Sequence, residues 1–183
     1  MARIYLVRHG EATDYAGPDP GLSELGANQA RQVAQRLDEI VGVPIDVISS
    51  PLRRARETAQ PLAERWSTET VVVDAVRELP SPGTQSERRP WLRAALHSTF
   101  AELGEQQRDW RAGILRALLQ CERDTAVFTH AVVISAVVGH LQDDDRVLAF
   151  LPANTSITIV ELVDGRLTLI ERGAGRDDVG DVG

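Results

Sequence analysis

Short runs of β-branched and other apolar residues alternate with longer segments of helical periodicity, and this alternation constrains the fold more than any other feature of the chain. The runs at residues 3–7, 45–48, 70–73 and 125–129 are predicted as strands. The first is almost continuously apolar, which is typical of a strand covered on both faces. Strands separated by helices pair mainly in parallel. The pattern therefore predicts an α/β fold with helices on both faces of a largely parallel sheet.

Two helix starts carry strong local signals. Ser23 is suited to cap a helix that continues to about residue 40 with apolar side chains on one face. Ser50 and Pro51 follow the second predicted strand, and they predict a helix with the serine as N-cap and the proline at the first helical position. That helix is expected to end near Trp66.

Further helices and a terminal hairpin complete the predicted order. Three helices are expected at residues 86–100, with Pro90 as an alternative start, at 105–121 and at 131–141. Predicted strands at 156–163 and 166–171 flank Asp164-Gly165, a dipeptide typical of a type I′ hairpin. The fold class is therefore a three-layer α/β/α sandwich around a mostly parallel mixed sheet of about six strands, with a C-terminal hairpin.

The length of 183 residues suits one domain. Residues 1–172 are predicted as that domain, because no linker or internal repeat interrupts them. Residues 173–183 are rich in glycine and aspartate, and we expect them to form a disordered tail.

The basic residues restrict how this protein could bind an anion. Lysine and arginine together number 20, and all of them are arginine. The absence of lysine excludes a Schiff-base lysine and a P-loop lysine, although it is also what codon usage in an arginine-rich genome would produce. An anion must therefore be held by guanidinium, imidazole, hydroxyl or backbone N–H groups, and guanidinium can donate two hydrogen bonds to phosphate or carboxylate at once.

The net charge and the cysteine content exclude or disfavour several kinds of binding partner and site. The formal net charge of −7 disfavours nucleic acid and anionic membranes. The single cysteine, Cys121, excludes an intrachain disulfide and a cysteine-based zinc site. No segment has the roughly 20 apolar residues of a membrane span, and the N-terminal apolar run is too short for a signal peptide, so we expect a cytoplasmic protein.

Reactive side chains follow three of the predicted strands. Arg8 and His9 follow the first, Arg54 the second and His130 the fourth. Carboxyl ends of parallel strands line the ligand crevice of α/β folds. Each residue alone has an ordinary structural interpretation, such as a hydrogen-bonded histidine or a solvated arginine, but their equivalent positions together predict an anion site.

These residues lie in motifs that resemble one known family. RHGEAT, GLSELGANQA, SSPLRRARETA, VFTHA and LPANTSITIVEL occur in the order seen in the histidine phosphatase superfamily, the phosphoglycerate mutase-like proteins. The match covers most of the chain, and it is closest in character to small bacterial phosphatases and phosphohistidine phosphatases. The resemblance implies a phosphoglycerate mutase-like fold.

The resemblance also implies a role for each residue. His9 would be the nucleophile that forms a phosphohistidine, and Arg8, Arg54 and His130 would hold the phosphoryl oxygens. Glu78 would protonate the leaving oxygen and then activate water. Three further positions would be supporting ones: Glu11, which is also the alternative proton donor; Tyr15, where phosphoglycerate mutases carry asparagine; and Ala131, where many relatives carry glycine.

The expected function is hydrolysis of a phosphomonoester or a phosphohistidine without a metal or cofactor. A phosphorylated small molecule and a phosphoprotein remain alternative substrates, and oligomeric state is left open. A phosphoglycerate-type mutase is the alternative enzyme, which Tyr15 and the short segment at 79–104 disfavour. A non-catalytic module that binds phosphorylated ligands is the alternative from another class.

Other polar residues receive structural interpretations. His97 is expected on a helix surface and His140 on a different helix face from His130, while Asp143, Asp144 and Asp145 are expected in a solvated turn. Residues 154–156 could reach the rim of the site, but entry into a strand is the simpler interpretation.

Overall fold

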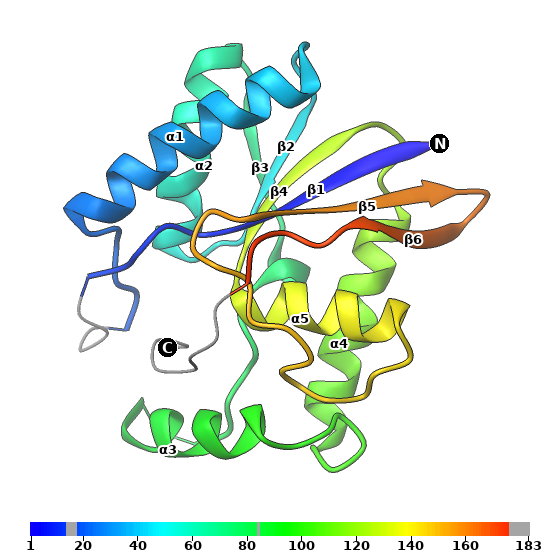
Figure 1. The fold of residues 1–183 in the computed structure, drawn as a ribbon. Coiled ribbons are helices and arrows are strands. Elements are labelled where there is room, and N and C mark those ends of the chain that lie inside the picture. Colours follow the sequence, from blue (N-terminus) through cyan, green and yellow to red (C-terminus); the bar gives the residue numbers. More distant parts are fainter. Residues whose placement is uncertain (14–17, 84, 176–183) are drawn as a thin grey trace.

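One six-stranded mixed sheet forms the centre of the computed structural model, which describes residues 1–13, 18–83 and 85–175 (Figure 1). The strands lie in the order β3-β2-β4-β1-β5-β6. Strands β3, β2, β4 and β1 pair in parallel, whereas β5 and β6 are antiparallel to their neighbours. Their bounds are β1 (Ala2–Arg8), β2 (Asp46–Ser49), β3 (Thr70–Val72), β4 (Thr125–Thr129), β5 (Ile157–Val163) and β6 (Arg166–Glu171).

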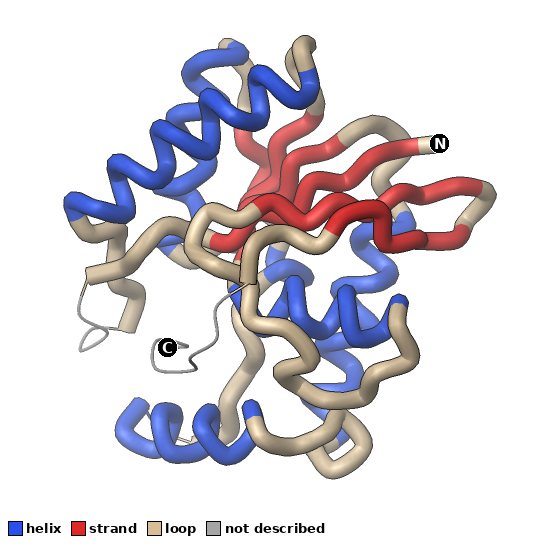
Figure 2. Tube along the Cα trace, viewed as in Figure 1, coloured by secondary structure: helices blue, strands red, loops and turns tan. Residues whose placement is uncertain are grey.

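Helices cover both faces of this sheet, so the predicted three-layer sandwich is confirmed (Figure 2). Helices α1 (Glu24–Val41) and α2 (Arg53–Trp66) pack side by side on one face. Helices α4 (Glu105–Leu119) and α5 (Ala131–Leu141) lie on the other face, with α3 (Gln85–Leu96) farther from the sheet and a short 3₁₀ helix at Asp74–Val76.

Strand β1 shows how the two cores form. Tyr5 and Val7 pack into the cluster beneath α1 and α2, whereas Ile4 and Leu6 belong to the cluster on the α5 side. This division follows from the strand period of two, which points successive side chains to opposite faces. Helix α5 is buried at every residue from 131 to 139, which explains its apolar sequence all round.

Most predicted boundaries agree with the structure, and the start of α2 is the main correction. Ser23 caps α1 as expected, and its side chain accepts a hydrogen bond from the N–H of Gly26. Helix α2, however, begins at Arg53 with Leu52 as its N-cap, so Ser50 and Pro51 precede the helix. The Ser50 hydroxyl still accepts the N–H of Leu52, at 3.3 Å, but it does so in the turn that leads into the helix.

The other differences are smaller. Helix α3 starts before Pro90, which lies inside it, and ends at Leu96 rather than near residue 100. Asp164 and Gly165 both have positive φ angles, 48° and 75°, as the predicted type I′ hairpin requires.

The described chain continues past residue 172, the expected end of the domain, and stays in contact with residues 152–153. The N–H of Ala153 donates to the carbonyl of Ala174 at 2.8 Å, and Pro152 bridges to Gly175. The chain therefore packs against the domain at least to residue 175, and residues 176–183 lie outside the described part. Within the described residues, no helix combines the length and the apolar character needed to cross a membrane.

Candidate active site

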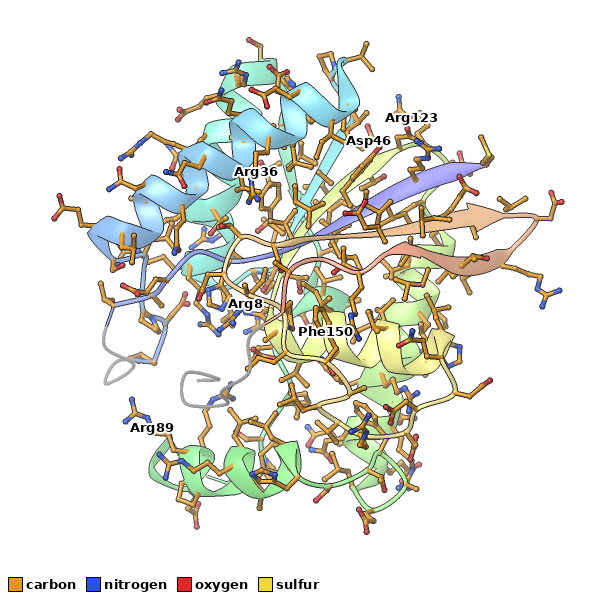
Figure 3. The ribbon with its side chains drawn as sticks, in the orientation of Figure 1. Arg8, Arg36, Asp46, Arg89, Arg123 and Phe150 are labelled. Carbon is orange, nitrogen blue, oxygen red and sulfur yellow. The ribbon has the colours of Figure 1, made fainter. Side chains whose placement is uncertain are left out.

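Five of the predicted site residues lie together at the carboxyl ends of the parallel strands. Arg8 is the last residue of β1 (Figure 3), and His9 follows it. Arg54 lies in the first turn of α2. His130 links β4 to α5, and Glu78 follows the 3₁₀ helix. All five are at most 4% exposed. The topology brings them together because β1, β4 and β2 are adjacent parallel strands.

The hydrogen bonds of His9 assign its tautomer. The Nδ1–H donates to the carbonyl of Gly10 at 2.7 Å, and the Nε of Arg54 donates to Nε2 of His9 at 3.1 Å. A guanidinium can only donate, so Nε2 must carry a lone pair. Burial lowers the pKa of His9 well below its ordinary value, and the charges of Arg54 and Arg8 lower it further. The ring is therefore neutral, with a nucleophilic nitrogen in direct contact with a cation.

Close packing of two glycines holds the loop that follows His9. A Cβ on Gly26 would lie 1.9 Å from the carbonyl oxygen of Glu11, and one on Gly10 would lie 2.6 Å from the carbonyl oxygen of Gly26. The N–H of Gly10 also donates to Oγ1 of Thr58 at 3.0 Å. The start of α1 and the middle of α2 therefore both fix the backbone beside the histidine.

The loop at residues 152–156 holds Arg8 and the backbone of His9. Nη1 of Arg8 donates to the carbonyl of Pro152 at 2.8 Å, and the side-chain amide of Asn154 donates to the carbonyl of His9 at 3.1 Å. Arg36 of α1 points toward this loop and donates to the carbonyl of Thr155 at 2.6 Å (Figure 3). Asn154 thus contacts backbone, and the supporting roles of Arg36 and Pro152 were not predicted from the sequence.

His130 lies between Ser50 and Glu78. Its Nε2 is 2.7 Å from Oγ of Ser50, and its Nδ1 is 3.8 Å from Oε2 of Glu78. The two imidazole rings, of His9 and His130, meet edge to face with centroids 5.2 Å apart. Burial lowers the pKa of His130 well below its ordinary value, and the nearby arginines add to this effect. His130 is therefore a second neutral imidazole in the cluster.

Glu78 differs from an exposed carboxyl in its pKa. Burial raises its pKa above the ordinary value, and this effect exceeds the opposing influence of Arg54, the Leu79 N–H, Arg88 and Arg8. Its Oε1 accepts the N–H of Leu79 at 3.0 Å, and its Oε2 faces His130. A carboxyl with a raised pKa can supply a proton near neutral pH.

Two of the remaining predicted residues, Glu11 and Ala131, lie in the described part of the chain. Glu11 accepts a hydrogen bond from the Ser23 hydroxyl at 2.8 Å and so supports the start of α1. Ala131 is buried at the first position of α5, whose positive N-terminal end adjoins His130. Tyr15 lies outside the described residues.

The polar residues with structural interpretations are also accounted for. His97 and His140 are exposed. Asp144 pairs with Arg146 at 2.5 Å, and Asp145 pairs with Arg111 at 2.6 Å. Across residues 1–13, 18–83 and 85–175, no group of three or more histidine, cysteine or acidic side chains is arranged to hold a metal ion.

Known proteins share this architecture. The native structure of a mycobacterial glucosyl-3-phosphoglycerate phosphatase superposes with a TM-score of 0.75 at 25% identity, covering 96% of this chain and 100% of the other. A Photorhabdus laumondii protein named "Probable phosphoglycerate mutase GpmB" is 31% identical over 163 residues, which are 76% of this chain and 74% of the relative.

A third relative is "Phosphoserine phosphatase 1" of Hydrogenobacter thermophilus, which is 40% identical over 86 residues, 43% of this chain and 39% of the relative. Several other curated relatives are matched over half of their length or less. The model of the histidine phosphatase superfamily, branch 1, matches residues 4–174. With this match over nearly all of the domain and the motif residues gathered in one buried cluster, the chain belongs to the histidine phosphatase superfamily.

Proposed function

We propose that this protein is a phosphohydrolase that works through a phosphohistidine on His9 and needs no metal ion. The observation that carries the proposal is the contact between the lone pair of His9 Nε2 and the guanidinium of Arg54. A phosphoryl group that approaches this nitrogen meets the arginine at the same point. The cations Arg8 and Arg54, the His130 ring and the start of α5 supply positive potential for the phosphoryl oxygens.

In the first half-reaction, the lone pair of His9 Nε2 attacks phosphorus, and the bond from phosphorus to the leaving oxygen breaks. That oxygen takes the proton of Glu78, whose raised pKa favours the protonated form. The Nδ1–H bond to the Gly10 carbonyl disperses the positive charge that develops on the ring. The guanidinium of Arg54 then contacts phosphoryl oxygen instead of Nε2.

In the second half-reaction, water attacks the phosphohistidine. The Glu78 carboxylate takes one proton from the water while the water oxygen bonds to phosphorus. The bond between phosphorus and Nε2 of His9 breaks at the same time. Inorganic phosphate leaves, and both His9 and Glu78 return to their starting states. Glu78 is the proposed donor rather than Glu11, since Glu78 faces His130 whereas Glu11 is engaged with Ser23.

The proposed substrates are small phosphomonoesters. Support comes from the names of relatives, one a phosphoserine phosphatase and another a phosphatase of glucosyl-3-phosphoglycerate. A phosphohistidine protein is the other substrate to test, since the reactive phosphoryl group is the same. Release of inorganic phosphate from a panel of both kinds ranks them.

The test of the mechanism is transfer of label from a ³²P-labelled substrate to the protein. We expect an acid-labile, base-stable label that is absent from His9→Ala, together with full activity in EDTA. His97→Ala, which changes an exposed histidine, is the matched control. Turnover by His9→Ala would refute the nucleophile, and loss of activity in EDTA would refute metal independence.

A mutase is the second candidate, because several matched relatives carry that name. A mutase must keep the phosphohistidine from water until the product is rephosphorylated. Incubation with 3-phosphoglycerate separates the two: a phosphatase releases inorganic phosphate, whereas a mutase forms 2-phosphoglycerate. Binding of phosphorylated ligands with neither product would instead indicate a non-catalytic module.

A further inference from the structure

The Ser50 hydroxyl is buried and contacts both the turn before α2 and the ring of His130. Ser50 is 0% exposed and directly follows β2, and its backbone N–H donates to the carbonyl of Phe128 at 2.9 Å. Its Oγ accepts the N–H of Leu52 at 3.3 Å and lies 2.7 Å from Nε2 of His130. Ser50 is therefore held on both sides of its hydroxyl, by the turn into α2 and by the histidine.

Counting protons assigns the direction of the bond to His130. A serine hydroxyl has one hydrogen to donate, and Ser50 already accepts from Leu52. Among the described residues, the Oγ has no hydrogen-bond partner besides the Leu52 N–H and His130 Nε2, so a proton on Nε2 would leave the buried hydroxyl hydrogen without an acceptor. The hydroxyl therefore donates to Nε2. Since the His130 ring is neutral, its single proton is then on Nδ1.

This tautomer places the proton of the His130 ring on Nδ1, the nitrogen that faces the site. Nδ1 of His130 is buried, forms no hydrogen bond within the described residues and faces Glu78 at 3.8 Å, beside His9. A protonated Nδ1 is a donor that attracts a phosphoryl oxygen, whereas a bare Nδ1 presents a lone pair that repels one. The tautomer of His130 thus decides whether this residue binds or opposes phosphate.

We propose that Ser50 is a positioning residue that holds His130 in its Nδ1–H tautomer, so that this ring donates a hydrogen bond to the phosphoryl group. The inference rests on the proposed function, because it assigns how one phosphate-contacting side chain of that site is held. Ser50 itself does not contact the reacting atoms.

The test begins with the resting protein and uses no substrate. The ¹⁵N chemical shifts of labelled histidines distinguish a protonated from a bare ring nitrogen, and His130→Gln identifies the signals of His130. We expect Nδ1 protonated and Nε2 bare in the wild-type protein. Protonated Nε2 in the wild-type protein would overturn the proposal without any variant and without reference to activity.

Variants then measure the effect of the hydroxyl. Ser50→Ala is expected to change the His130 signals toward the other tautomer, to weaken binding of inorganic phosphate and to lower kcat/KM by about 10- to 100-fold, as for the loss of an outer partner of a functional histidine. Ser50→Thr retains a hydroxyl and should restore the Nδ1–H signature.

Ser135→Ala is the matched control. Its hydroxyl is also buried, donates to the carbonyl of Val147 at 3.0 Å and accepts the N–H of Phe150 at 3.2 Å, away from the cluster. It should leave the His130 signals and kcat/KM unchanged. Unchanged His130 signals in Ser50→Ala would overturn the positioning role of Ser50. Failure of His9 to take up the phosphoryl label would instead overturn the proposed function and leave the tautomer assignment of His130 intact.

Discussion

The two buried imidazoles make the stability of this protein sensitive to acid, and equilibrium unfolding measures the effect. The pKa values of His9 and His130 lie well below the ordinary 6.5 in the folded protein, mainly because of burial. The unfolded chain therefore binds protons that the folded chain excludes. By linkage, the free energy of unfolding falls as the pH drops through the unfolded pKa.

The magnitude follows from the unfolded value. Because both folded pKa values lie well below the ordinary value, each ring lowers the free energy of unfolding by about 1 kcal/mol between pH 7 and pH 5.5, so the pair lowers it by about 2 kcal/mol. Glu78 acts in the opposite sense, because its raised pKa lets the folded protein take up a proton as the pH falls. This contribution is common to the histidine variants and largely cancels when they are compared with the wild-type protein.

The assay is urea unfolding at the two pH values for the wild-type protein, His9→Gln and His130→Gln. Each glutamine variant is expected to lose about 1 kcal/mol less than the wild-type protein on acidification. His97→Gln and His140→Gln, which change exposed histidines, are the controls and should match the wild-type protein. Wild-type pH dependence in the His9 and His130 variants as well would show that the two rings are not held neutral in the folded protein.

Three further predictions test the site and the packing that supports it. Arg54→Lys should lower kcat/KM by about 100-fold or more in a phosphate-release assay, since a single ammonium cannot replace the guanidinium at His9. The control is Arg56→Lys, which changes an exposed arginine on the same helix and should have little effect. Glu78→Gln should lower kcat by about 100-fold and remove the contribution of this carboxyl to the pH dependence of kcat. Glu11→Gln should lower the melting temperature more than it lowers kcat. The reverse outcome would exchange the roles of the two residues. Gly26→Ala should lower the free energy of unfolding by about 1–3 kcal/mol, because its Cβ would overlap the Glu11 carbonyl, and wild-type stability would refute that close approach.

Much of the fold could be predicted because its signals are local. Strand β4 and helix α5 have the expected bounds, since a buried apolar run and a helical period are visible in consecutive residues. The Ser23 cap is local for the same reason, because its partner Gly26 is three residues away. Ser50 and Pro51 show the limit: the pair has the composition of a helix start, but the helix begins at Arg53, and the Ser50 hydroxyl contacts the distant His130.

For the site, the sequence by itself determined which side chains follow the strands, and hence that Arg8, His9, Arg54 and His130 would share one edge of a parallel sheet. Tertiary structure alone decided how they are held. The bond between His130 and Ser50 joins residues 80 positions apart, and that between Arg8 and the Pro152 carbonyl joins residues 144 apart. Tautomers and pKa values depend on such partners and on burial, which no local pattern contains, so the chemistry of the site became visible only when the chain was folded.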